Sequence, residues 1–126
     1  MLTRLAALRA EPKFVDEPGT IYNGMRPEQD RRAAEDLLNN LIERLMREAG
    51  ETLAKRFVLA RCAQTLVHFP GHDTEDRERM CRYIEQTVEI LGMDKPRGLL
   101  TRWLYGPILG TLVLLSQRRK ASRPTT

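Results

Sequence analysis

The stretch PEQDRRAAEDLLNNLIERLMREA, residues 27–49, decides the fold. Its apolar side chains recur every three or four positions, which places them on one stripe of a helix with about 3.6 residues per turn. Pro27 suits the first helical position, because the N–H that proline lacks is unused there. Gly50 is a natural stop. The stretch therefore predicts a long amphipathic helix. Its expected buried stripe is Ala34, Leu37, Leu38, Leu41, Ile42, Leu45, Met46 and Ala49.

A second long helix is predicted over residues 52–68. Its apolar face is broad and includes Phe57 and Val67. One of the two cysteines, Cys62, lies in this helix, and the other, Cys81, lies in the next. Both occupy apolar-compatible helical positions, where cysteine packs as a small hydrophobic residue. We therefore interpret them as buried free thiols.

The third long helix is predicted over residues 73–91, with Gly92 as its stop. Asp73 has the spacing of a capping residue, and Asp76, three residues later, can bond back to it. Charged residues at i,i+4, such as Glu75 and Arg79, stabilise a helix by about 0.2–0.5 kcal/mol per pair. We interpret the charge run as a solvated face.

Shorter segments flank these helices. Residues 1–10 are amphipathic but too short to stay helical without packing on something. Residues 11–25 are rich in proline and glycine, which predicts a loop. Four apolar residues should hold this loop on the domain: Phe14, Val15, Ile21 and Tyr22. Residues 98–106 predict a short helix. Residues 108–115 are almost wholly apolar and are compatible with a helix or a strand.

These patterns predict an all-α fold: a compact bundle of three long helices plus one or two short C-terminal helices. A chain of 126 residues suits one domain, which we place at residues 1–116, with an ordered loop over 11–25. Residues 117–126 are expected to form a basic, flexible tail. The broad apolar faces of the first two long helices favour a homodimer, since obligate interfaces resemble a core cut in half.

The charge distribution weakens a nucleic-acid-binding hypothesis for the folded part. The net charge is +4, from 21 basic and 17 acidic residues. Four basic residues and no acid lie in residues 117–126, so the rest of the chain sums to zero. A nucleic-acid-binding domain usually spreads positive charge over a folded face. The N-terminus lacks a sustained apolar segment of the kind found in secretory signals, so a cytoplasmic location is the default expectation.

A transmembrane span is not expected. The apolar region near the C-terminus is bounded by Arg102 and Gln117, with only 14 residues between them. A spanning helix needs about 20 apolar residues. Arg118, Arg119 and Lys120 follow directly, and basic residues beside an apolar segment can attach a protein to anionic lipid. A buried element followed by a solubilising tail is the favoured interpretation.

No pattern of catalytic, cofactor-binding or metal-ligating residues stands out. His68 and His72 have the four-residue spacing of a metal pair, but Pro70 and Gly71 break the helix between them. No glycine-rich phosphate loop is present. We therefore predict no catalytic residue, no cofactor and no metal. One weaker alternative is a hydrolase-like enzyme in which carboxylates from different helices converge near His72: Glu35, Asp36 and Asp73.

Two motifs carry a resemblance to a known family. They are DTEDRE at residues 73–78 and the pattern GLLxxWLYG at residues 98–106. Together they resemble an uncharacterised family of small bacterial all-helical proteins, over about residues 30–106. The resemblance implies a bacterial source and a compact helical fold. It implies no established activity, so no functional residue is transferred from it.

The leading functional hypothesis is a non-enzymatic protein–protein interaction module, such as an adaptor or an immunity-type protein. Trp103 and Tyr105 are large amphipathic rings beside a Gly-Pro break, where they can form an interaction patch. The alternative is peripheral binding of anionic membrane or nucleic acid through Arg118, Arg119 and Lys120. That alternative predicts strongly salt-dependent binding.

Overall fold

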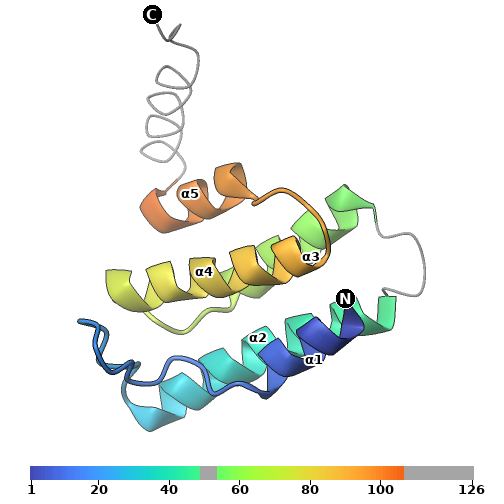
Figure 1. The fold of residues 1–126 in the computed structure, drawn as a ribbon. Helices are drawn as coiled ribbons and strands as arrows, with labels where there is room; N and C mark the ends of the chain where they lie inside the picture. The colour runs from blue at the N-terminus through green and yellow to red at the C-terminus, as the bar shows by residue number, and fades with distance from the viewer. Residues whose placement is uncertain (49–53, 107–126) are drawn as a thin grey trace, which may run out of the picture. The chain divides into compact units, whose positions relative to one another are not determined.

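The structure is a computed structural model that describes residues 1–48 and 54–106. Within these residues the chain forms five α-helices and no strand, which confirms the all-α prediction (Figure 1). The helices are α1 (Leu2–Ala10), α2 (Glu28–Glu48), α3 (Lys55–Val67), α4 (Thr74–Ile90) and α5 (Arg97–Tyr105). They belong to two units, residues 1–95 and the part of the chain from Pro96 onward. The apolar run 108–115 and the tail 117–126 lie outside the described residues.

In the first unit, both α1 and α3 pack on α2 (Figure 1). The predicted stripe supplies five fully or nearly buried side chains: Ala34, Leu38, Leu41, Ile42 and Leu45. The short helix α1 packs on both α2 and α4 and buries Leu5 and Leu8. That burial explains how nine residues persist as a helix, since an isolated helix of this length is marginal in water.

Helix α3 differs from its prediction in its start and its apolar face. The helix begins at Lys55. Ala54, which was predicted to be helical, has an extended backbone and precedes the helix. Val58, Cys62 and Leu66 are buried, but Phe57 is 52% exposed and Val67 is 77% exposed. A helix 13 residues long packed mainly on α2 covers one stripe, and these two side chains fall outside it.

Helix α4 begins where it was predicted, but its cap does not form as expected. Asp73 is the N-cap residue by backbone geometry, yet its side chain makes no capping hydrogen bond. Asp76 does not bond back to Asp73. It is buried and accepts a hydrogen bond from the hydroxyl of Tyr22 instead. A partner distant in sequence thus replaces the local capping interaction.

We call residues 11–27 the anchored loop, because their side chains and backbone are tied to the helices. Phe14 is fully buried, and its ring centroid lies 5.7 Å from that of Phe69 and 5.1 Å from that of Tyr83. The N–H of Met25 donates to the carbonyl of Phe14 at 2.8 Å, closing the loop on itself. Gly24 makes this approach feasible, since a Cβ there would lie 2.8 Å from a backbone nitrogen.

Two of the four expected anchors of this loop face solvent. Phe14 and Tyr22 are buried as predicted, whereas Val15 and Ile21 are exposed. Lys13 is buried in addition, which the sequence pattern did not indicate. Alternation of apolar and polar residues does not apply to an irregular segment, so only the tertiary contacts select which side chains turn inward.

In the second unit, the helix α5 has nine residues and ends at Gly106, whose φ of 86° suits glycine. Leu100 is its buried residue. Among the described residues, no helix combines the length and the apolar character that crossing a bilayer would require.

Candidate functional site

A basic groove runs between α2 and α3 and is the strongest candidate site in the described residues. It has a volume of about 520 Å³. The α2 side supplies Leu37, Asn40, Leu41, Arg44 and Arg47, and the α3 side supplies Arg61, Gln64, Thr65 and His68. We call this surface the α2–α3 groove. Its lining combines three guanidinium groups, an imidazole and two amides over an apolar floor, and none of these lining residues is acidic.

The spacing of the lining residues follows from helical geometry. On α2, Asn40, Arg44 and Arg47 are separated by four and three positions, so they share one flank of the helix. On α3, Arg61, Gln64 and His68 have the complementary spacing of three and four. Each set borders the apolar stripe of its own helix. When those stripes pack together, the two polar flanks become the walls of one groove.

Three charged groups meet at this groove. The Nε of Arg44 lies 3.4 Å from Oε1 of Glu48, and Nη2 of Arg61 lies 3.5 Å from the same oxygen. Arg61 also donates from Nη1 to Oε1 of Gln64 at 3.5 Å. Its Nε is buried and has no hydrogen-bond partner among the residues that the structure describes. Two cations therefore converge on one carboxylate oxygen, with donor capacity left over.

The sequence alone did not indicate this groove, and neither Arg44, Arg47 nor Arg61 stands out in it as a site residue. The available signal was the three-and-four spacing of basic and amide residues beside each apolar stripe. That signal becomes a site only when the partner flank is known, and the pairing of α2 with α3 is a tertiary property.

A second polar cluster joins the anchored loop to α4. Tyr22 donates its hydroxyl hydrogen to Oδ1 of Asp76 at 2.8 Å, and both residues are buried. The guanidinium of Arg79 stacks 4.4 Å from the centroid of the Tyr22 ring and pairs with Glu17 at 2.7 Å. Arg79 thus bonds to the loop and not, as predicted, to Glu75. The hydroxyl of Tyr83 accepts from the N–H of Phe14 at 3.2 Å.

The titration of this cluster reflects its burial. Burial raises the pKa of the Asp76 carboxyl above its ordinary value, and the hydrogen bond from Tyr22 acts in the opposite direction. Burial, with the hydrogen bond to Asp76 next, raises the pKa of the Tyr22 hydroxyl. The phenol therefore stays protonated over the physiological range, so it serves as a donor. The cluster is suited to fastening the loop on α4, and we assign it that structural task.

A third cluster fastens the loop to α2. Oε2 of Glu35 accepts from the backbone N–H of Lys13 at 2.8 Å and from Nη1 of Arg31 at 3.1 Å. The ammonium of Lys13 donates to the carbonyl oxygens of Arg9 and Glu11. Burial lowers the pKa of Lys13, while the nearby Glu35 counteracts that effect. Glu35, one carboxylate of the enzyme alternative, is thus engaged in holding the loop.

The other residues singled out from the sequence are dispersed. His72 and Asp73 are exposed just before α4, and Asp36 is exposed on α2. Among the described residues, no three His, Cys, Asp or Glu side chains are grouped so as to hold a metal ion. Both cysteines are buried free thiols, as predicted, and burial raises the pKa of each to about 12.

The predicted interaction residues all belong to the part of the chain from Pro96 onward. Tyr105 is 45% exposed at the end of α5, and Trp103 is partly buried on the same helix. Their role in binding stays a prediction. Arg118, Arg119 and Lys120 lie outside the described residues, so the tail hypothesis likewise stays a prediction.

The fold and the groove define the class: a small all-α protein with a groove lined by basic residues between two of its helices. Within this class, the profile of the family DUF4844, a domain of unknown function, matches residues 1–107. The chain therefore belongs to the DUF4844 family. This membership confirms that the protein is part of an uncharacterised family.

A solved structure shares the fold. It is the crystal structure of a DUF3571 family protein from Acinetobacter baumannii AYE, with a TM-score of 0.75 and 22% sequence identity. The similarity covers 89% of this chain and 94% of that chain. At this identity the likeness shows the fold alone. No curated protein matches the chain.

Proposed function

We propose that this protein is a non-enzymatic interaction module that binds an anionic segment of another protein in the α2–α3 groove, as an adaptor or an immunity-type protein would. One observation carries the proposal. Three arginines line one open groove whose other lining residues are neutral amides, a hydroxyl, an imidazole and leucines. The guanidinium group of arginine can form paired hydrogen bonds to a carboxylate or a phosphate. The leucines of the groove add apolar contact area for the side chains of a bound segment.

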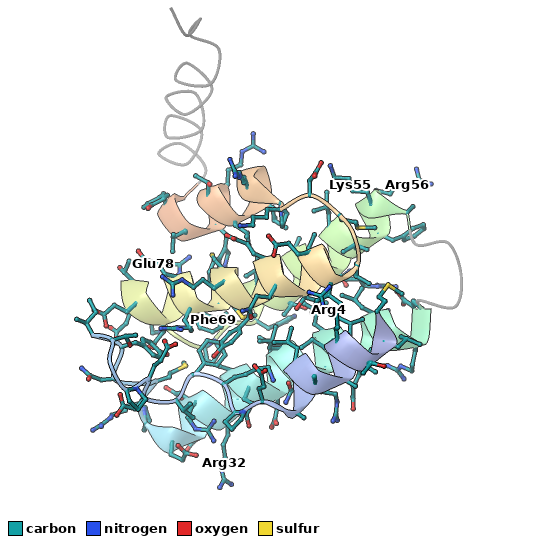
Figure 2. All side chains as sticks on the ribbon, in the orientation of Figure 1. Arg4, Arg32, Lys55, Arg56, Phe69 and Glu78 are labelled. Atoms are coloured by element: carbon teal, nitrogen blue, oxygen red, sulfur yellow. The ribbon has the colours of Figure 1, made fainter. Side chains whose placement is uncertain are left out.

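Neighbouring charge supports the same proposal. Lys55 and Arg56 are exposed at the start of α3, and both are labelled in Figure 2. They lie outside the groove lining and add to the positive charge of α3. Positive charge on a protein surface raises the rate at which an acidic partner docks, in a salt-dependent way.

A paired-variant capture experiment tests the proposal. Full-length protein is immobilised and used to capture partners from its native cell, and the partner is then purified and its affinity measured. The test variant is Arg44→Gln with Arg47→Gln. The control is Arg4→Gln with Arg32→Gln, which removes the same amount of charge from two exposed positions outside the groove lining (Figure 2). We expect the test variant to bind the partner roughly tenfold more weakly or worse, a loss of about 1.4 kcal/mol per tenfold. The control variant should lose little affinity.

Equal losses in both variants would contradict a specific role of the groove. Deletion of residues 117–126 addresses the alternative hypothesis in the same assay. If partner, lipid or nucleic-acid binding disappears with the tail and not with the groove arginines, the tail is the binding element and the groove proposal is wrong. Specific turnover of a substrate in an activity screen would likewise overturn the non-enzymatic proposal.

A further inference from the structure

A carboxylate that is not part of the groove lining, that of Glu48, pairs loosely with two of the arginines that line the α2–α3 groove. Oε1 of Glu48 lies 3.4 Å from Arg44 and 3.5 Å from Arg61, whereas a charge-assisted N–H···O bond is about 2.7–2.9 Å long. The side chains of Arg44 and Arg61 are 47% and 25% exposed. The two guanidinium groups are thus brought to one point by the fold, and the group between them leaves both of them incompletely satisfied.

A ligand must compete with Glu48 for this position. Glu48 follows Arg44 by four residues on the same helix, so its effective concentration at the site corresponds to an intramolecular ligand, on the order of millimolar or above. A carboxylate from a partner carries the same single charge and has no electrostatic advantage over it. A phosphodiester of nucleic acid also carries one charge. Singly charged groups are therefore poor replacements for Glu48.

A phosphate monoester is better suited. It carries a charge of about −1.5 to −2 at pH 7 and has three acceptor oxygens. It can accept from Arg44 and Arg61 together and still present an oxygen to Arg47, which lines the same groove.

We propose that the α2–α3 groove binds a phosphorylated side chain of a partner protein, with the phosphate between Arg44 and Arg61 in the place of Glu48. This inference rests on the proposed function and names the chemistry of its ligand. The groove favours a peptide as the source of the phosphate. It is open and about 520 Å³ in volume, and the amides of Asn40 and Gln64 stand on opposite walls, where they can bond to an extended backbone.

The test compares ligands on the full-length protein by NMR titration and calorimetry. The probes are a short alanine peptide with a central phosphoserine, the same peptide with a central glutamate, inorganic phosphate, and a single-stranded oligonucleotide. We expect the phosphoserine peptide to bind at least about tenfold more tightly than each of the others, with the largest NMR shifts at the Arg44 and Arg61 side chains. Equal affinity for the glutamate peptide, for inorganic phosphate or for the oligonucleotide would overturn the inference.

Substitution of the resident carboxylate provides a gain-of-binding readout. Glu48→Gln removes the competitor, and since ion pairs near the surface are individually weak, phosphopeptide affinity should rise by about fivefold at most and by a measurable amount. The matched control is Glu78→Gln on α4, which changes the net charge equally at an exposed position (Figure 2). Arg44→Gln should weaken binding by about fivefold or more. If Glu48→Gln binds no better than Glu78→Gln, the inference is wrong.

Phosphatase treatment of a captured partner separates this inference from the proposed function. Capture that requires Arg44 and Arg47 but survives the phosphatase would leave the interaction module intact and overturn the phosphate inference. Capture that requires the arginines and is abolished by the phosphatase supports both. Capture that ignores the arginines overturns both.

Discussion

Replacing Tyr22 with phenylalanine isolates the hydrogen bond that fastens the anchored loop to α4. The ring of Tyr22 is buried and carries Arg79 on its face at 4.4 Å, and phenylalanine preserves both features. Only the hydroxyl disappears, and with it the 2.8 Å bond to Asp76. Asp76 is 6% exposed, so water cannot readily replace the lost donor.

The size of the effect depends on the charge of Asp76. A hydrogen bond to an ionised group contributes about 1.5–3 kcal/mol, and one between neutral groups contributes about 1 kcal/mol. We therefore expect Tyr22→Phe to lower the free energy of unfolding by about 2 kcal/mol at a pH above the folded-state pKa of Asp76, where its carboxylate is ionised. At a pH low enough to protonate Asp76, the loss should fall to about 1 kcal/mol.

The sign of the pH dependence follows from the raised pKa of Asp76. Because burial raises the pKa in the folded state above 3.8, the folded protein binds this proton more tightly than the unfolded chain does. The cost of ionised Asp76 is thus present at neutral pH and is relieved as pH falls through its folded pKa. Loss of the Tyr22 hydroxyl raises that pKa further, so the added destabilisation diminishes in the same acidic range.

Urea unfolding of wild type and variant at a series of pH values from neutral to acidic measures this difference. Tyr105→Phe is the control, since Tyr105 is 45% exposed and its hydroxyl removal should change stability by less than about 0.5 kcal/mol at any pH. A double variant that adds Asp76→Asn gives the coupling energy of the pair. A loss below about 0.5 kcal/mol at pH 7, or one that does not vary with pH, would refute the assignment of this bond.

Three further predictions concern the fold. Gly24→Ala should destabilise the protein by about 2 kcal/mol or more, because the residue has a φ of 84° and the added Cβ would lie 2.8 Å from a backbone atom. Gly19→Ala is the control: its φ is 86° but the space around it is open, so it should cost only about 1 kcal/mol, and equal losses in urea unfolding would contradict this. Leu38→Ala should cost about 3–5 kcal/mol in thermal unfolding, since Leu38 is fully buried on α2; a loss below about 1 kcal/mol would place it outside the core. Cys62 and Cys81, both buried with pKa values of about 12, should react with a thiol reagent only after unfolding, and fast reaction of the native protein would contradict their burial.

The candidate site was less accessible to sequence reasoning than the helices. Arg61 lies near Arg44 and Glu48 only because of how α3 lies against α2. Asp76 was predicted to take part in capping α4. That prediction was wrong, because its hydrogen-bond partner is Tyr22, which is 54 positions away in the sequence. Polar residues acquire their partners from tertiary packing, and one sequence carries no signal for a pair so far apart.

The local pattern of apolar residues was enough to predict that this protein is helical and where its main helices lie. The period of about 3.6 residues is a local property, and a continuous apolar stripe such as the one on α2 is stable only as a helix that buries that stripe. Tertiary structure alone decided which polar groups meet. The axial register of α2 against α3 brings Arg44 and Arg61 to Glu48, and the path of the anchored loop brings Tyr22 to Asp76. Those positions follow from how the apolar surfaces interlock, and periodicity along one helix does not specify that.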